Sequence, residues 1–223
     1  MIVVYIVGTG SHWQDNELRY SLRSVEKHLK GFRNIFIVGH ISEWLKNVKV
    51  IPSSDISGGY EPERNVLNKL RVGCEFIDFE KFLFMNDDFF FLQDVGADQI
   101  PYFYEGSIED WLAKRGLDRY GHCANNTLKQ LQKNNLPTNN YELHYPIIFE
   151  KQKLLPIIPS SQSLTIRSLY ANTYQVKGIQ ADDCKSDKPP LDGAAYYSTK
   201  PRVTDEVQKF LIERFPKKSK YEK

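Results

Sequence analysis

The feature that most constrains the fold is a continuous apolar, mostly β-branched run at 2–7, which ends at Gly8-Thr9-Gly10-Ser11. A strand that is apolar at every position needs cover on both faces, as strands have in parallel sheets with helices on each side. Glycines directly after such a strand are typical of a loop that faces a ligand. We therefore interpret 2–7 as a buried strand of a parallel sheet.

Helical and strand patterns alternate after this run. Apolar residues at positions 18, 22, 25 and 29 predict one stripe of a helix that Asp15 or Asn16 can cap. The other elements expected in this half are buried strands at 34–39, 48–51 and 81–85, and a helix at about 62–76 after a polar loop through 57–59. This alternation predicts a Rossmann-like α/β fold with a mostly parallel sheet flanked by helices, in which ligands bind at the carboxyl ends of the strands.

The second half of the chain is less regular. One helix is predicted near 125–133, and another at about 204–215 with Thr204 as its cap. A chain of 223 residues falls in the size range of one domain. The expected organisation is a single domain at 1–216, made of a nucleotide-binding half at 1–95 and an acceptor-side half at 96–216, and a basic tail at 217–223.

Charge and cysteine content exclude several classes of protein. The formal net charge of +2 is too small to indicate a nucleic-acid footprint, and the four lysines of the tail are expected to be a solvated end. Cys74, Cys123 and Cys184 form no CxxC or Cys/His cluster, so neither a disulfide framework nor a zinc site is predicted. No segment approaches the length of a membrane span. A reducing cytoplasm is therefore the expected location.

The main candidate for chemistry is Asn86-Asp87-Asp88, which follows the predicted buried strand 81–85. Two carboxylates at the rim of a buried strand repel each other and are costly to desolvate, and a divalent cation relieves both penalties. Mn²⁺ or Mg²⁺ would also screen the charge on a departing diphosphate. The alternative is that Asp87 and Asp88 cap a turn or pair with lysines. Apolar residues on both sides of the pair favour the metal site.

A second candidate is the glycine loop and the helix after it. Gly8 and Gly10 permit close approach of the backbone to a phosphate or nucleoside, although they form neither a GxGxxG fingerprint nor a P-loop. Arg19 and Arg23 are one helical turn apart, so they can grip a diphosphate from a common face. The alternative is that the two arginines are exposed and pair with Glu26 and other acidic residues. The spacing alone slightly favours this alternative.

Several stretches resemble a known family. The segment DNELRYSLRSVEK at 15–27, the strand at 34–38 and the segment FLFMNDDFF at 82–90 resemble the Stealth family of sugar-phosphate transferases, whose core is similar to GT-A glycosyltransferases. The element Leu143-His144-Tyr145-Pro146 is similar to the family's histidine-proline element, and 167–172 to its arginine-bearing segment. The chain is also similar to short glycosyltransferase-like proteins of phages and gut bacteria. The resemblance implies a GT-A-like catalytic domain.

The resemblance also implies roles for individual residues. Asp87 and Asp88 would bind the metal and the donor diphosphate, with Asp88 also acting in catalysis. The residues expected to contact the donor, the acceptor or a phosphate are Gly8, Gly10, Asn16, Arg19, Arg23, Lys69, Asn86, Arg167 and Asn172.

A histidine and a second acidic pair complete the candidates. His144 would be a general base for an acceptor hydroxyl or a metal ligand, because an imidazole exchanges protons near neutral pH. Its alternative is a buried structural histidine. Asp183, next to Asp182, would be a base or a further ligand, or would pair with Lys185 and Lys188 on a surface loop.

Three functions fit these features. The first is a metal-dependent glycosyltransferase that moves a sugar from a nucleotide sugar, expected to be a UDP-sugar, to an acceptor hydroxyl. The second transfers a sugar 1-phosphate, as in the Stealth family. The third is a non-catalytic carbohydrate- or nucleic-acid-binding module. The acceptor would be a polysaccharide or other glycan, or a modified base of phage DNA, in the cytoplasm of a bacterium or of a phage-infected cell.

Overall fold

The structure is a computed structural model that describes residues 1–57 and 61–223, so the polar loop expected at 57–59 lies mostly outside the described residues. Its strands are β1 (Ile2–Val7), β2 (Leu29–Lys30), β3 (Ile35–Gly39), β4 (Lys49–Pro52), β5 (Lys81–Met85), β6 (Phe89–Phe91), β7 (Val95–Gly96), β8 (Tyr102–Tyr104), β9 (Ile147–Glu150), β10 (Gly178–Gln180), β11 (Lys185–Ser186) and β12 (Tyr196–Thr199). Its helices are α1 (Asn16–His28), α2 (Pro62–Phe76), α3 (Ile108–Arg115), α4 (Arg119–Lys133), α5 (Lys151–Leu154), the 3₁₀ helix η1 (Leu155–Ile157), α6 (Ile166–Thr173) and α7 (Asp205–Arg214). None of the helices in these two ranges is long and apolar enough to cross a membrane.

The centre of the fold is a five-stranded sheet in the order β4-β3-β1-β5-β9. β1 is parallel to β3 and β5, β3 is parallel to β4, and β9 is antiparallel to β5. All residues of β1 are buried, which explains why its sequence is apolar throughout. The expected Rossmann-like α/β fold in one domain, with a mostly parallel sheet flanked by helices, is confirmed.

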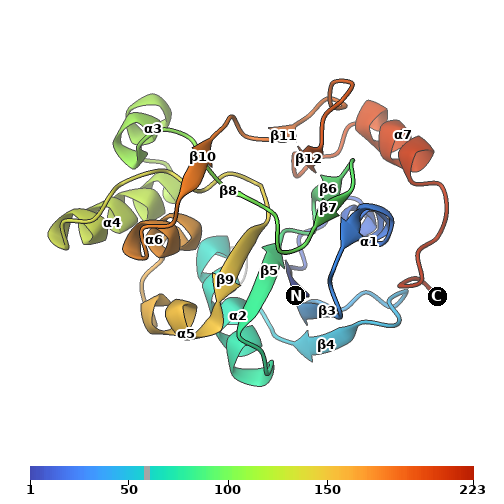
Figure 1. Ribbon diagram of the computed structural model, residues 1–223, viewed down its shortest axis with the longest axis horizontal. Coiled ribbons are helices and arrows are strands. Elements are labelled where there is room, and N and C mark those ends of the chain that lie inside the picture. Colours follow the sequence, from blue (N-terminus) through green and yellow to red (C-terminus); the bar gives the residue numbers. More distant parts are fainter. Residues whose placement is uncertain (58–60) are drawn as a thin grey trace.

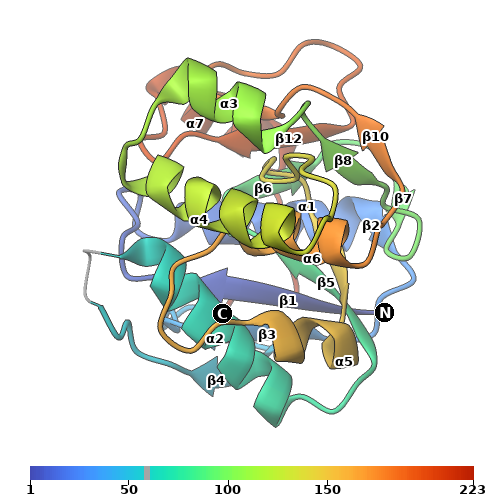
Figure 2. The same ribbon diagram turned by 90° about the vertical axis from the view of Figure 1, so that its left-hand side faces the viewer.

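Helices cover both faces of this sheet (Figures 1 and 2). Val3 and Val7 of β1 pack in one apolar cluster with Leu22 of α1. Val4 of β1 points to the other face, where it joins Leu70 and other residues of α2, α4 and α6. A third cluster holds α7 against α1, β6 and β12, and Figure 1 shows α7 beyond α1 on the right of the sheet. The alternation of side chains along β1 thus separates the first two clusters, one on each face of the sheet, and the third cluster lies outside them.

The chain changes direction between β1 and β5. From β1 the strands β3 and β4 extend the sheet to one side, and α2 then carries the chain back to β5 on the other side of β1. In open α/β sheets, ligands bind outside the carboxyl ends of the strands at such a switch point. The loops after β1 and β5, at 8–11 and 86–88, both lie there.

Local capping explains where some helices begin. Thr204 accepts a hydrogen bond from the N–H of Val207 and caps α7, as expected. The helix expected near 125–133 begins earlier, at 119, because Asp118 accepts a hydrogen bond of 2.7 Å from the N–H of Gly121. The capping residue shows where this helix starts, while the apolar stripe shows only its later turns.

The segment 217–223 is not a solvated tail, contrary to expectation. Its lysines are exposed, but Ser219, Tyr221 and Glu222 between them are buried. The carbonyl of Tyr221 also accepts a hydrogen bond from the N–H of Lys46. Lysine content misled the prediction, because the residues that anchor the segment are the few that are not lysine.

Candidate active site

A cavity of about 210 Å³, which we call the acidic cavity, opens at the switch point. Gly8 and Gly10 reach it from the loop after β1, Asp87 and Asp88 from the loop after β5, and Glu17 from the first turn of α1. Its other lining residues are Ser11, Lys200 and Pro201. The glycine loop and the acidic pair that the sequence singled out therefore meet in space.

A hydrogen-bond network around Ser11 places Glu17 in this cavity. The Ser11 hydroxyl accepts hydrogen bonds from the N–H groups of Trp13 and Asp15, and donates one of 2.8 Å to the Glu17 carboxylate. The chain before α1 turns through Gln14 and Asp15, both with φ of 56°, a conformation that is uncommon outside glycine. Asp15 occupies the N-cap position of α1 without a side-chain capping hydrogen bond, and its carboxylate instead accepts a hydrogen bond of 2.7 Å from the Ser42 hydroxyl.

Glu17 was not among the residues singled out from the sequence. It is 7% exposed, and the polar residues that follow it at helical spacing, Ser21, Ser24 and His28, are buried too. This stripe of positions 17, 21, 24 and 28 runs beside the apolar stripe of α1. Small polar residues repeating at that spacing were the available signal that the buried face of the helix is wider than its apolar stripe.

Electrostatic compensation in the acidic cavity is incomplete. Burial, together with the Asp88 and Glu17 carboxylates, raises the pKa of Asp87 to about 7. Burial also raises the pKa of Glu17. Lys185 donates a hydrogen bond of 2.9 Å to Asp88 Oδ2, whereas Asp88 Oδ1 is buried and has no hydrogen-bond partner among the described residues. The expected lysine alternative therefore holds for one oxygen of Asp88 and leaves the other available.

The donor set fits a divalent cation only in part. Within residues 1–57 and 61–223, no three His, Cys, Asp or Glu side chains are arranged to hold a metal ion. Asp87 and Asp88 would supply carboxylate oxygens, and a diphosphate and water would have to complete the coordination, as they commonly do around Mg²⁺. The unpartnered Oδ1 of Asp88 and the raised pKa of Asp87 are compatible with a cation at this position.

Arg19 and Arg23 do not line the acidic cavity. Arg23 Nε and Nη2 each lie 2.7 Å from an oxygen of Glu222, and Arg19 Nη1 lies 3.4 Å from the same carboxylate. Arg19 also stacks over Trp44. The two arginines therefore pair with Glu222, and they neither line the acidic cavity nor form ion pairs with Glu26. The spacing of a helix cannot reveal a buried partner that lies some 200 residues further along the chain.

Lys69 is also placed differently from the expectation. It is 2% exposed, donates a hydrogen bond of 2.9 Å to the carbonyl of Val7, and pairs with Asp55 at 2.5 Å. A Cβ on Gly39 would lie 3.0 Å from Lys69 Cε and 2.1 Å from the Val7 oxygen, so the glycine leaves room for this contact. Lys69 therefore holds the carbonyl at the end of β1 and does not line the acidic cavity.

Two expected substrate-binding asparagines have other positions. The Asn172 side chain exchanges hydrogen bonds with the backbone of Asn139 and donates one to the carbonyl of Ser168, and its residue is buried within α6. Asn16 is the first residue of α1 and does not line the acidic cavity. A buried amide that bonds only to backbone explains Asn172 as a structural residue.

His144 and Asp183, both expected to act in catalysis, form a hydrogen-bonded pair. His144 Nδ1 lies 2.7 Å from Asp183 Oδ2, and the His144 N–H donates a hydrogen bond of 3.0 Å to Oδ1. Burial acts to raise the pKa of Asp183, but the hydrogen bonds from His144 outweigh it, so the pKa is lowered. A carboxylate at Nδ1 orients the imidazole and leaves Nε2 free to accept a proton from a hydroxyl. Asp183 therefore does not serve as a surface partner of Lys188.

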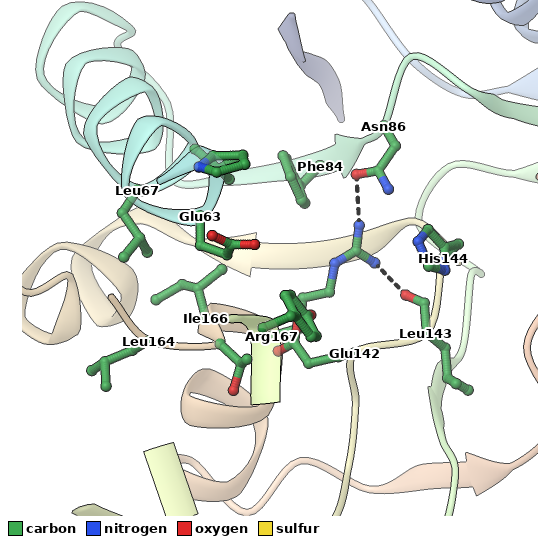
Figure 3. Close-up of a pocket in the computed structure, with 14 residues that line it drawn as sticks. Glu63, Leu67, Phe84, Asn86, Glu142, Leu143, His144, Leu164, Ile166 and Arg167 are labelled. Carbon is green, nitrogen blue, oxygen red and sulfur yellow. Dashed lines mark hydrogen bonds between the residues drawn. The ribbon is translucent and has the colours of Figure 1, made fainter. Parts of the chain in front are cut away.

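Arg167 joins this pair to the acidic strand end (Figure 3). Its Nη1 donates hydrogen bonds to the carbonyls of Leu143 and Tyr145, on either side of His144. Its Nη2 donates a hydrogen bond of 3.0 Å to Asn86 Oδ1. Burial lowers the pKa of this guanidinium. Arg167 and Asn86 thus hold the His144 loop beside Asp87 and Asp88, and both also line a second cavity.

The second cavity, which we call the α2–α6 pocket, has a volume of about 220 Å³ (Figure 3). Phe84 and Asn86 face it, whereas Asp87 and Asp88 face the acidic cavity. β5 ends at Met85, so Asn86, Asp87 and Asp88 belong to the loop that follows it, and this loop contributes residues to both cavities. His144 lines the α2–α6 pocket and does not line the acidic cavity.

Comparisons with known proteins give a partial match. No family model matches the chain. The chain is 35% identical over 106 residues to the N-acetylglucosamine-1-phosphotransferase subunits alpha/beta of Homo sapiens, and 35% identical over 108 residues to those of Mus musculus. Each match covers 40% of this chain and 8% of the relative, so the chain corresponds to a small part of the length of these proteins.

One solved structure can be compared as well. The structure of the bifunctional IspDF from Campylobacter jejuni is 12% identical to this chain. The match covers 81% of this chain and 49% of the IspDF chain, with a TM-score of 0.39. The class that the fold and cavities define is a Rossmann-like α/β protein with an acidic site at its switch point. Over the matched part it is similar to a sugar-phosphate transferase, which partly supports the Stealth resemblance.

Proposed function

We propose that this chain is a metal-dependent transferase that uses a nucleotide sugar, such as a UDP-sugar, as its donor and a hydroxyl as its acceptor. The observation that carries the proposal is the under-compensated carboxylate group of the acidic cavity, with the His144–Asp183 pair held at the same strand end through Arg167 and Asn86. A metal and diphosphate would remove the electrostatic cost of that group, and the histidine would remove the proton of the acceptor.

The residues divide the work in this proposal. Asp87 and Asp88 hold Mn²⁺ or Mg²⁺ together with the donor diphosphate, and Gly8 and Gly10 leave space for the nucleotide. The bound ion would supply screening of the charge that develops on the leaving nucleotide. His144 Nε2 accepts the proton of the acceptor hydroxyl, and Asp183 orients the ring and stabilises its protonated form.

The name of the relatives favours transfer of a sugar 1-phosphate. In that reaction the acceptor oxygen attacks the β-phosphorus, the bond to the α-phosphate breaks, and a nucleoside monophosphate leaves. Transfer of the sugar alone would break the bond at the anomeric carbon and release a nucleoside diphosphate. The nucleotide that accumulates therefore separates the two reactions, and we propose the monophosphate. The acceptor proposed is a glycan hydroxyl.

The test combines product analysis with variants. Purified protein is incubated with UDP-sugars, Mn²⁺ and glycan acceptors, and the nucleotides are separated by chromatography. We expect UMP with the wild type and a loss of about 10²- to 10⁴-fold in rate for His144→Ala, the range typical of a general base. Asp182→Asn, which changes an exposed carboxylate beside the pair, is the matched control and should keep the wild-type rate.

Binding measurements test the acidic cavity separately. Metal-dependent donor binding should be lost in Asp87→Ala and Asp88→Ala. Unchanged binding in both variants would reject the acidic cavity as the donor site. Metal-dependent binding that never leads to turnover with any acceptor would favour a non-catalytic carbohydrate-binding module instead.

A further inference from the structure

The α2–α6 pocket has an apolar floor that the proposed chemistry does not use. Val66 and Leu67 of α2, Phe84 of β5, and Leu164 and Ile166 at the start of α6 line it. These side chains come from elements that pack together in the core, so the floor is held rigidly. An apolar surface of this kind suits the flat face of a ring that carries C–H groups.

One polar group of the pocket lacks a partner. Glu63 Oε1 lies 3.4 Å from Arg119, whereas its Oε2 is buried and makes no hydrogen bond within the part of the chain that the structure describes. The Glu63 side chain is 12% exposed, and Figure 3 shows its carboxylate turned toward the side of the pocket where Arg167 lies. A buried acceptor without a donor is costly, so a ligand that donates a hydrogen bond there would be favoured.

The other carboxylate of the pocket is already satisfied. Glu142 Oε1 accepts a hydrogen bond of 2.8 Å from the N–H of Ser168, and Oε2 accepts one of 3.1 Å from the hydroxyl of Tyr120. Glu63 is therefore the carboxylate of the pocket with an oxygen that lacks a donor among the described residues. The two carboxylates of Glu63 and Glu142 outnumber the one guanidinium in the pocket, that of Arg167, which disfavours a phosphate there.

Shape and chemistry together select the ligand. The volume of about 220 Å³ is below the roughly 300 Å³ at which sites for drug-sized molecules begin, so the pocket suits a single ring. A uracil ring presents two carbonyl acceptors and one N–H, so it matches a carboxylate poorly. A neutral pyranose presents several hydroxyl donors around an apolar ring, which matches both Glu63 and the floor.

We propose that the α2–α6 pocket binds one neutral pyranose ring and that Glu63 accepts hydrogen bonds from its hydroxyls. The inference rests on the proposed function, because the ring belongs to the donor or to the acceptor of that reaction. Asn86 and His144 line the same pocket, so the ring lies between the proposed proton acceptor and the strand end that carries Asp87 and Asp88. Glu63 is on this view a residue that determines sugar specificity.

The test measures sugar binding with and without the Glu63 carboxylate. Calorimetry with Mn²⁺ compares UDP with UDP-glucose, UDP-galactose and UDP-N-acetylglucosamine, and a second arm titrates the methyl glycosides of the same sugars in the presence of UDP. If the ring is that of the donor, Glu63→Ala should weaken UDP-sugar binding by about tenfold or more and leave UDP within twofold. If the ring is that of the acceptor, the second arm should show the loss.

A matched control and a clear failure complete the experiment. Glu109 on α3 has the same arrangement, with one oxygen bonded to Gln132 and the other buried without a partner, but it does not line the pocket. Glu109→Ala should leave all sugar affinities unchanged. Unchanged affinities in Glu63→Ala, or no sugar bound by the wild type in either arm, would overturn the inference. Absence of UDP binding with a Glu63-dependent response to glycosides would instead reject the proposed donor and keep the pocket.

Discussion

Two groups of buried carboxylates lie along α1, and they are compensated in opposite ways. Glu222, whose side chain is 0% exposed, receives charged hydrogen bonds from Arg23, so its pKa is lowered although burial acts to raise it. Asp87 lies in the acidic cavity with Glu17 from the first turn of the same helix, and burial together with the Asp88 and Glu17 carboxylates raises its pKa. The same helix therefore contributes arginines that neutralise Glu222 and a glutamate, Glu17, that adds to the repulsion around Asp87.

The difference separates structure from function. Glu222 ties the last residues to α1, and every part of its carboxylate has a donor from Arg19, Arg23 or Ser219. Of the three carboxylates in the acidic cavity, only Asp88 has an ion-pair partner among the described residues, namely Lys185, although Lys200 also lines the cavity; this leaves a cost that folding alone does not relieve. Such under-compensation is typical of functional sites, where a ligand supplies the missing charge.

The largest effect is expected at the satisfied carboxylate. Glu222→Gln leaves the guanidinium groups of Arg19 and Arg23 without their anion in a largely buried site. We expect a loss of about 3 kcal/mol in the free energy of unfolding, the lower part of the range for breaking a buried ion pair. Urea unfolding followed by circular dichroism measures the change, with the slope against urea checked for constancy.

The matched control is a glutamate in an exposed pair. Glu213 lies 3.9 Å from Lys209, and both side chains are mostly exposed. Glu213→Gln should change stability by less than about 0.5 kcal/mol. Equal losses in the two variants would mean that burial does not set the strength of the Glu222 cluster, and the comparison between the two groups would fail.

The second prediction concerns the sign of the pH dependence in metal-free protein. Folding raises the pKa of Asp87 from an ordinary value of 3.8 to about 7, so its stabilising contribution is complete below pH 3.8 and is lost as the pH rises toward 7. Asp87→Asn removes this loss. The difference between a pKa of 3.8 and one of about 7 corresponds to about 4 kcal/mol, and burial of the Asn amide offsets part of it, so at pH 8 with EDTA the variant should be more stable than the wild type by on the order of 1–2 kcal/mol.

The same measurement on Glu222 should give the opposite slope. Its folded pKa lies below the ordinary value of 4.5, so its contribution is present above that pH and is lost as the pH falls through the folded pKa. Unfolding free energies from pH 3 to 8 for the wild type, Asp87→Asn and Glu222→Gln provide both difference curves. A flat difference curve for Asp87 between pH 4 and 7 would show that its carboxylate is compensated after all.

The acidic cavity was predictable from sequence for a simple reason. The apolar strands at 2–7 and 81–85 were expected to be buried strands of a parallel sheet. Adjacent parallel strands have their carboxyl ends at the same edge of the sheet. Gly8, Gly10, Asp87 and Asp88 therefore converge without any knowledge of the loops. The start of α2 at 62 was equally accessible, because proline is favoured in the first turn of a helix.

The remaining contacts depend on tertiary structure that local patterns do not encode. Arg23 and Glu222 are 199 residues apart, and His144 and Asp183 are separated by 39 residues and five intervening structural elements. Lys69 was expected to contact a phosphate, but it is buried and bonds to Asp55 and to the end of β1. Residue type predicted which side chains matter at the strand ends, but only packing decides which of the charges are already paired.

The smallest expected effect comes from the lysine that half-neutralises the acidic cavity. Lys185→Met keeps most of the side-chain volume and removes the cation that holds Asp88 Oδ2. If Asp88 and Asp87 hold a divalent ion, Mn²⁺ should stabilise Lys185→Met more than it stabilises the wild type, by about 1 kcal/mol, because the ion no longer competes with a neighbouring positive charge. Thermal unfolding at several Mn²⁺ concentrations measures this increment.

Lys188→Met is the control, because Lys188 is exposed nearby and its side chain has no ion-pair partner among the described residues. An equal Mn²⁺ increment in the wild type and Lys185→Met would indicate that the ion, if bound, lies away from Asp88. Loss of the increment in Lys185→Met would mean that Lys185 helps to build the site, so that the lysine and the metal act together on a diphosphate. Only a larger Mn²⁺ stabilisation of Lys185→Met supports the comparison made above. In that comparison, arginines of the chain neutralise Glu222, whereas a bound cation neutralises the carboxylates of the acidic cavity.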